Sequence, residues 1–214
     1  MKGELASIAS RFDSISLRAY VRSKLKRDPV YEATWRLLEH SALPVLDIGC
    51  GIGLLPMFLR ERGFRGEMIG LDTDSEKISI ARKVTELDAS TTFRTQDAAE
   101  GFADFQGSLT MLDVLHYLTT EDQRILLDRA AQSVASGGMA IIRDCPRDNT
   151  WRYRATYLEE LFAVKVGWLK VPRLNFPTLQ QLIHPFASRG FASEVRPLWG
   201  KTPFNNHLFV FRRP

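Results

Sequence analysis

Residues 45–53 read VLDIGCGIG, and they carry the strongest structural signal in the sequence. Its apolar half contains Asp47, and three glycines follow at alternating positions, Gly49, Gly51 and Gly53, before a helical pattern begins. Glycine tolerates sharp turns and the close approach of a ligand, and the first N–H groups of a helix have no partner within the helix. The stretch therefore predicts a strand, a ligand-binding glycine loop and a helix.

Apolar runs of strand length alternate with helical patterns after this loop as well. The expected strands are PVLDIG, GEMIGLD, TTFRTQD, SLTMLDV and GGMAIIRD, and the expected helices between them are residues 54–62, 75–87 and 120–135. Because each helix must return the chain to the edge where the next strand begins, this order predicts a parallel sheet. Such sheets bind ligands at the carboxyl ends of their strands.

The two ends of the chain carry other patterns. Before the alternation we expect helices from Asp13 or Ser14 to Arg27 and over residues 30–40, and after Asp144 an aromatic-rich helical insertion. A helix at residues 178–189 and an antiparallel pair of strands, FASEVRPLW and NHLFVFRR, complete the pattern. The sequence thus predicts a doubly wound α/β fold: a mostly parallel seven-stranded sheet with an antiparallel C-terminal edge hairpin, N-terminal helices and a helical insertion after strand 5.

The length of 214 residues fits one domain, since single cores stop growing only at about 250–300 residues. We expect this domain to consist of four parts. They are the N-terminal helices (1–42), a cofactor-binding core (43–144), a helical cap (145–177), and a C-terminal helix with edge strands (178–214).

The spacing of the glycines in this loop distinguishes between two classes of cofactor. The dinucleotide fingerprint G-x-G-x-x-G would need glycine three residues after Gly51, where Leu54 stands. The motif D-I-G-C-G-I-G instead resembles the first motif of the class I S-adenosylmethionine methyltransferases, an acidic residue followed by G-x-G-x-G. The resemblance covers residues 43–144. It implies S-adenosyl-L-methionine as the cofactor and methyl transfer as the activity.

Positions after the glycine loop extend the expected cofactor site. Asp72 ends the second strand, where a carboxylate can accept hydrogen bonds from both ribose hydroxyls; capping the next helix is the alternative role. Asp97 and the Ala98 N–H offer an acceptor and a donor that match the edge of adenine. The resemblance supports the ribose role and places Thr73 beside the adenine. The expected cofactor-binding residues are Asp47, Gly49, Cys50, Gly51, Gly53, Asp72, Thr73, Asp97, Ala98, Leu112 and Asp113.

His116 is the candidate catalytic residue. It follows three residues after Asp113, at the end of the fourth strand, and in the resembling family this strand end lies beneath the reactive methyl group. Neutral histidine is a frequent proton shuttle, and a packed or helix-capping histidine is the alternative. The candidate substrate contacts are Tyr117, Arg143 and Trp151.

Two features of the sequence bear on metals and on the acceptor. The oxygen ligands that suit magnesium are Asp113, Asp144, Asp148 and Asn149. The pair Asp148 and Asn149 lies beyond the fifth strand instead of ending it, so we expect no metal.

The insertion carries aromatic side chains that can roof an apolar pocket or pack beneath a surface helix. They are Trp151, Tyr153, Tyr157, Phe162 and Trp168.

Charge and composition limit the classes of partner and the cellular location that we expect for this protein. Residues 18–27, RAYVRSKLKR, carry five basic residues and no acid within a net charge of +4; such a run is a solvated helix face, a carboxylate contact or a docking surface for an acidic carrier protein. An appended nucleic-acid module is absent, and L-D-V-L stands where many nucleic-acid amine methyltransferases carry an N-P-P-Y-type tetrapeptide. Without an apolar segment of about 20 residues or a signal-peptide core, we expect a cytoplasmic protein with no membrane span.

The expected function is therefore methyl transfer from S-adenosylmethionine to oxygen or carbon of a small or carrier-protein-tethered metabolite, with nucleic acid not expected as a partner. The alternative is a non-catalytic cofactor-binding module that serves interaction or sensing through its basic helix. The sequence leaves the oligomeric state open.

Overall fold

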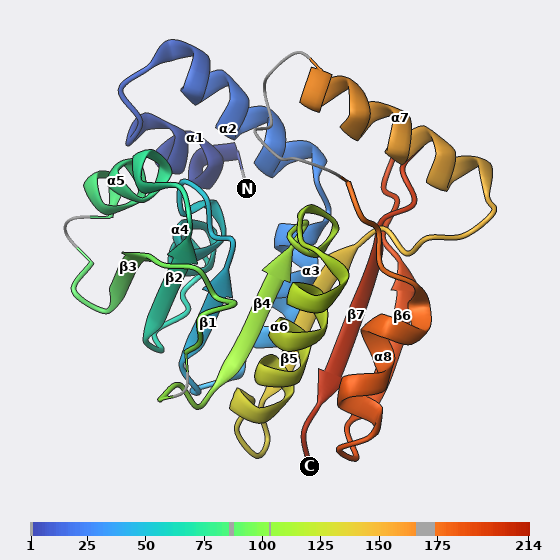
Figure 1. Ribbon diagram of the computed structural model, residues 1–214. Helices are drawn as coiled ribbons and strands as arrows, with labels where there is room; N and C mark the ends of the chain where they lie inside the picture. Colours follow the sequence, from blue (N-terminus) through green and yellow to red (C-terminus); the bar gives the residue numbers. More distant parts are fainter. Residues whose placement is uncertain (1, 86–87, 103, 166–173) are drawn as a thin grey trace. The chain divides into compact units, whose positions relative to one another are not determined.

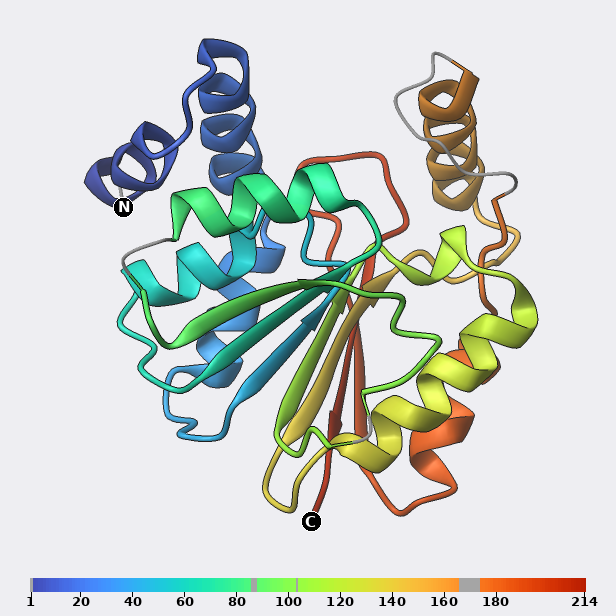
Figure 2. The ribbon, with the colours of Figure 1, turned by 60° about the vertical axis from the view of Figure 1, so that its left-hand side comes forward.

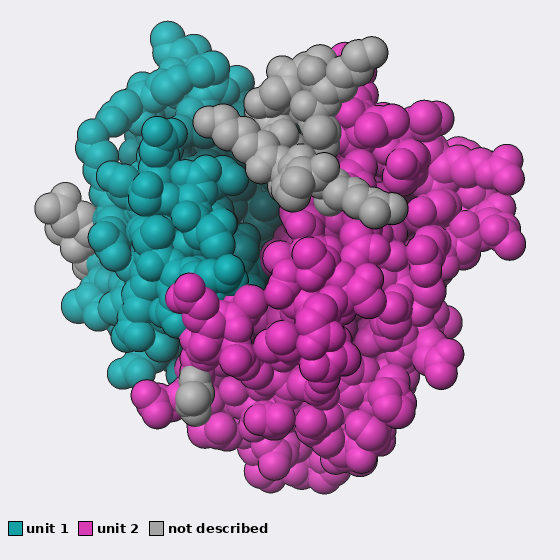
Figure 3. Space-filling model, in the orientation of Figure 1, with its two compact units in different colours: residues 1–98 teal, residues 99–214 magenta. Residues whose placement is uncertain are grey.

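The computed structural model describes residues 2–85, 88–102, 104–165 and 174–214. Its strands form a seven-stranded sheet in the order β3-β2-β1-β4-β5-β7-β6. The chain divides into two compact units, residues 1–98 and 99–214 (Figure 3). The strand order and the antiparallel pair at one edge confirm the predicted fold class.

The first unit combines the N-terminal helices with three parallel strands (Figure 1). Its elements are α1 (Lys2–Ser10), α2 (Ile15–Arg27), α3 (Val30–Leu38), β1 (Val45–Ile48), α4 (Leu54–Glu61), β2 (Met68–Asp72), α5 (Ser75–Val84) and β3 (Thr91–Thr95). β1 pairs with β2 and β2 with β3, so that Asp47 lies opposite Gly70 and Gly70 opposite Phe93. All the strands and helices predicted for this part are present, with ends that differ by up to two residues. The predicted helix over residues 75–87 is present as α5, and its last two residues lie outside the described residues.

One helix of this unit was not predicted. α1 contains Gly3 and two serines, Ser7 and Ser10, which lower its intrinsic helix propensity. Ile8 and Ala9 are nonetheless completely buried, and the helix packs against α2 and α4. Tertiary packing, which the local sequence pattern does not reveal, therefore stabilises α1.

The second unit contains the remaining four strands and the insertion. Its elements are β4 (Ser108–Leu112), the short 3-10 helix η1 (Leu115–Tyr117), α6 (Thr120–Ser133), β5 (Met139–Asp144), α7 (Trp151–Lys165), α8 (Leu179–Ala187), β6 (Ala192–Pro197) and β7 (His207–Arg212). β4 and β5 are parallel, and β7 is antiparallel to both β5 and β6. The antiparallel pair of β6 and β7 was predicted. α6 and α8 lie side by side on one face of these strands (Figure 2).

The predicted helical insertion is present as α7, which follows β5 after a short loop. Residues 166–173, and with them Trp168, lie outside the described residues. None of the described helices has the length and apolar character needed to cross a bilayer.

The neighbours of Gly70, in β2, leave no room for a side chain at this position. A Cβ at Gly70 would lie 2.5 Å from Cδ1 of Phe93 and 2.8 Å from Sγ of Cys50. Because overpacking forces side chains and backbone to shift, we expect Gly70→Ala to lower the free energy of unfolding by about 1–3 kcal/mol. Denaturant unfolding measures this loss. Gly3→Ala, where no atom lies within 4 Å of the added carbon, is the control, and an equal loss in both variants would contradict the packing explanation.

Candidate functional site

The glycine loop after β1 has the backbone conformation that the motif predicts. The φ angles of Gly49, Gly51 and Gly53 are 72°, 54° and 78°, in a region that residues with a side chain rarely adopt. The N–H groups of Gly49 and Cys50 donate to the Leu71 carbonyl at 2.7 and 3.0 Å, which fixes the loop to the end of β2. The Gly53 N–H donates to the Cys50 carbonyl, and α4 begins directly afterwards.

The glycines serve different purposes. A Cβ at Gly53 would lie 2.9 Å from Cζ of Phe93 and 3.2 Å from Cβ of Ala81, so this glycine permits close packing. A Cβ at Gly51 would meet no atom within 4 Å. The space beside Gly51 is open, and a ligand can reach the backbone there.

Asp72 joins this loop to the neighbouring strand end. Its Oδ2 accepts a hydrogen bond from the Gly51 N–H at 2.8 Å, and its Oδ1 accepts one from the Asp74 N–H at 2.9 Å. Asp74, not Asp72, caps α5, since it accepts from the N–H groups of Glu76 and Lys77. Each carboxylate oxygen of Asp72 keeps a lone pair for a further donor. The bond from Asp72 to the loop was not predicted from the sequence.

The other predicted cofactor residues of the first unit lie near these two. Asp47 and Cys50 are buried, and burial raises the pKa of the Cys50 thiol, with the charges of Asp47 and Asp72 adding to the effect. The Gln96 N–H donates to the Asp72 carbonyl at 3.0 Å, which fixes the segment after β3 beside Asp72. In that segment Asp97 is exposed and Ala98 is buried; the side chain of Thr73 is also exposed.

In the second unit, His116 lies in η1 and is 3% exposed. Its Nδ1 lies 2.9 Å from Oδ1 of Asp144, the last residue of β5. The N–H groups of Leu115 and Cys145 also donate to this carboxylate, at 3.1 and 2.8 Å, and they fix its orientation. Because an ionised carboxylate only accepts hydrogen bonds, Nδ1 carries the proton of the neutral ring and Nε2 carries the lone pair.

The second ring nitrogen of His116 is left without a hydrogen bond among the described residues. Oε1 of Glu160, on α7, lies 3.7 Å from this Nε2, and Oε2 of Glu160 accepts from the Tyr117 hydroxyl at 3.0 Å. Phe176 stacks on the imidazole with 4.9 Å between ring centroids and 8° between planes. The ring is thus held in place, while its buried Nε2 has no hydrogen-bond partner among the described residues.

Neighbouring carboxylates raise the pKa of His116. Burial disfavours the charged ring and lowers its pKa, but the charge and hydrogen bond of Asp144, with the charges of Asp113 and Glu160, outweigh burial and raise the pKa to about 8. Burial raises the pKa of Glu160, although His116 and Tyr117 oppose the shift. The group can therefore exchange protons near neutral pH.

The end of β4 is a strained position. Asp113 has a φ of 61°, a left-handed conformation that costs most residues other than glycine roughly 1–2 kcal/mol and that aspartate adopts more readily than most. Its N–H donates to the Arg143 carbonyl at 2.9 Å, and its carboxylate pairs with the Arg143 guanidinium. Such strain gathers at functional sites, which supports a role for this strand end.

The predicted substrate contacts differ in their surroundings. Arg143 is 3% exposed and pairs with Asp113, Tyr117 is half-buried, and Trp151 is 63% exposed with the Arg152 guanidinium over its ring. Their roles stay predictions.

The aromatic residues of the insertion lie in different surroundings. Tyr153 and Tyr157 lie with their ring centroids 5.6 and 6.2 Å from that of Phe176, which itself stacks on His116. Phe162 is 67% exposed. Part of the set thus gathers around the candidate base, and part faces solvent.

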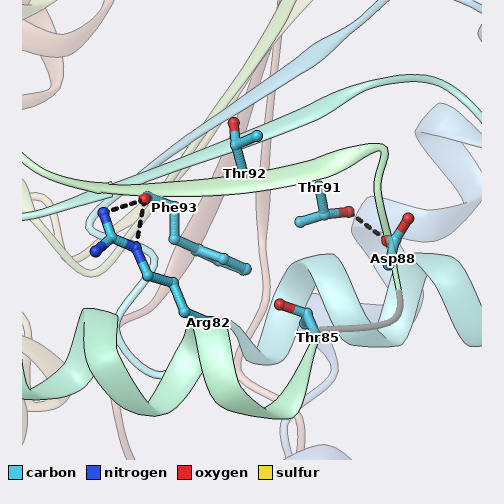
Figure 4. Close-up of a pocket in the computed structure, with 6 residues that line it drawn as sticks. All are labelled: Arg82, Thr85, Asp88, Thr91, Thr92 and Phe93. Atoms are coloured by element: carbon cyan, nitrogen blue, oxygen red, sulfur yellow. Dashed lines mark hydrogen bonds between the residues drawn. The ribbon is translucent and has the colours of Figure 1, made fainter.

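A hollow of about 260 Å³ lies elsewhere in the first unit, between α5 and β3 (Figure 4). Its polar groups satisfy one another: the Arg82 guanidinium donates twice to the Phe93 carbonyl, and the Thr91 hydroxyl donates to Asp88. It contains none of the predicted site residues. Within the described part of the chain, no group of three or more His, Cys, Asp and Glu side chains could hold a metal ion.

Comparisons with known proteins find a family model that matches part of the chain. Residues 45–138 match the family model described as a methyltransferase domain. A search of curated proteins finds no match.

Solved structures share the fold at low sequence identity. Magnesium protoporphyrin IX methyltransferase (ChlM) from Synechocystis PCC 6803 with bound SAH is 18% identical, with a TM-score of 0.68 over 100% of this chain and 94% of that chain. The pyocyanin biosynthetic protein PhzM is 16% identical, with a TM-score of 0.67 over 97% of this chain and 61% of that chain. The N-methyltransferase NodS from Bradyrhizobium japonicum WM9 is 17% identical, with a TM-score of 0.63 over 86% of this chain and 94% of that chain.

Proposed function

We propose that this chain is a class I S-adenosylmethionine-dependent methyltransferase and that it methylates a hydroxyl group of a small molecule with His116 as general base. The observation that carries the proposal is the buried pair of His116 and Asp144, whose remaining nitrogen has no partner among the described residues. A base is needed only where the acceptor is protonated. A carboxylate acceptor would need none, so a base oriented in this way favours a hydroxyl acceptor.

The residues of the first unit fit S-adenosylmethionine, which supplies an electrophilic methyl group on a sulfonium when bound. The open space beside Gly51 gives a ligand access to the backbone, and the spare lone pairs of Asp72 suit the two ribose hydroxyls. Asp97 and the Ala98 N–H are proposed to bind the edge of adenine.

His116 removes the proton in this mechanism. Its Nε2 accepts the proton of the acceptor hydroxyl and leaves an oxygen nucleophile. Asp144 stays ionised, holds the ring in the tautomer with Nδ1 protonated, and stabilises the imidazolium that forms. Correct positioning of reacting groups can contribute up to about 7–11 kcal/mol to lowering a barrier, which is why the constraints on the ring matter.

The surroundings of His116 favour an aromatic acceptor such as a phenol. Phe176, Tyr153 and Tyr157 form an aromatic cluster that begins at the imidazole, and aromatic side chains commonly line small-molecule sites. A carrier-tethered acceptor, the absence of a nucleic-acid partner and the cytoplasmic location remain predictions.

The pH dependence of the reaction tests the base. Only neutral His116 accepts a proton, so a pKa raised to about 8 means that kcat/KM increases as the pH rises through about 8. Asp144→Asn removes the charge that raises this pKa, and we expect the increase to move to lower pH. S-adenosylhomocysteine formation in the presence of cell extract measures the profile.

The control for this variant is Asp148→Asn. Asp148 bonds to Thr150 and Asn205 and not to the histidine, so its profile should match the wild type. A wild-type profile without an inflection between pH 6 and about 9, the range around the ordinary and raised histidine pKa values, would rule out His116 as the base.

A further inference from the structure

A buried base must release its proton before the next turnover. His116 is 3% exposed, and its Nε2 is buried. The proton cannot leave through Asp144, because that side chain is completely buried and accepts from Leu115 and Cys145 as well as from the ring. An exit must lie on the Nε2 side.

Glu160 occupies that side. Its Oε1 lies 3.7 Å from Nε2, less than about 1 Å beyond hydrogen-bond distance. Its side chain is 17% exposed, compared with 4% for the His116 side chain, so it connects the buried ring with solvent. The hydrogen bond from the Tyr117 hydroxyl holds the other carboxylate oxygen and aims Oε1 at the ring.

The titratable groups around His116 come from four parts of the chain. Asp144 lies on β5, Asp113 follows β4, Glu160 lies on α7 and the Tyr117 hydroxyl belongs to η1. Asp113 is paired with Arg143, and burial raises the pKa of Tyr117, which keeps its hydroxyl protonated as a donor. Of the carboxylates, only Glu160 faces the free nitrogen and reaches solvent.

We propose that Glu160 carries the ring proton of His116 from Nε2 to water after each methyl transfer. Glu160 is a positioning residue, because it acts through His116 and not on the acceptor. The inference rests on the proposed function, in which Nε2 takes this proton. The acceptor O–H bond breaks as the Nε2–H bond forms. The imidazolium then passes the Nε2 proton to Oε1, which restores the neutral ring and leaves a neutral carboxylic acid, and water takes the proton from that acid. No other reactant is required.

The test measures the His116 ring directly, by NMR of the full chain with ¹⁵N-labelled histidine and without acceptor. Glu160→Gln removes the carboxylate and keeps the size of the side chain. We expect this variant to lower the His116 pKa and to slow exchange of the ring proton with solvent at least tenfold. The control is Glu159→Gln, an exposed carboxylate on the same helix, which should change neither value. Glu160→Asp keeps a carboxylate and should recover part of the exchange rate.

Two outcomes would overturn the proposal. One is an exchange rate in Glu160→Gln equal to that of the wild type; a lower pKa with unchanged exchange would make Glu160 a charged neighbour and no more. The other is a Glu160→Asp variant as slow as Glu160→Gln with its fold intact. Since the ring is observed without turnover, either result is distinct from failure of the proposed function, which the activity of a His116→Asn variant tests.

Discussion

Methyl transfer by the His116→Asn variant is expected to fall by about 10²–10⁴-fold, the usual contribution of a general base. Asparagine can still donate a hydrogen bond toward Asp144, so the carboxylate that bonds to Nδ1 at 2.9 Å keeps a partner. It cannot accept a proton near neutral pH. The measurement is the rate of S-adenosylhomocysteine formation with a panel of phenols and with cell extract.

Binding separates a lost base from a damaged protein. The proposed cofactor residues around the glycine loop belong to the first unit, and we expect the affinity of His116→Asn for S-adenosylhomocysteine to stay within about threefold of the wild type. His184→Asn, at an exposed histidine on α8, is the matched control and should keep full activity. Retention of wild-type turnover by His116→Asn would remove the histidine from the mechanism.

The parts of the fold that depend on local pattern were predictable. Residues 45–53 specify a strand, a loop with positive φ angles and a helix, because glycine alone suits three such angles in one short turn. The antiparallel edge pair followed from the short connection between its strands. α1 was missed because its stability comes from the buried side chains of Ile8 and Ala9, and not from its own propensities.

The candidate site was predictable only in part. His116 and Asp144 were both considered, but as a lone histidine and as a potential metal ligand, and their pairing joins residues 28 apart in the sequence. A usable signal existed: β4 and β5 are parallel neighbours, so the residues that end them share one edge of the sheet. No such rule applies to Glu160, since α7 is an insertion whose placement depends on tertiary packing.

Asp72→Asn is the variant expected to weaken cofactor binding most. Hydrogen bonds to a charged group are each worth roughly 1.5–3 kcal/mol, and we propose that this carboxylate accepts from both ribose hydroxyls. The amide keeps the volume but has one acceptor oxygen, so it also loses the bond from either Gly51 or Asp74. Calorimetric titration with S-adenosylmethionine and S-adenosylhomocysteine should show a Kd raised about 100-fold, which corresponds to ~3 kcal/mol.

The neighbouring acid provides a matched control. Asp74→Asn changes a carboxylate two residues away that caps α5 and bonds to Glu76 and Lys77, not to the loop. Because asparagine caps a helix about as well as aspartate, this variant should bind both ligands normally. If Asp72→Asn binds as tightly as Asp74→Asn, the second strand end does not hold the sugar. If both bind weakly, the loss comes from displacement of α5, and the direct contact with the ribose is wrong.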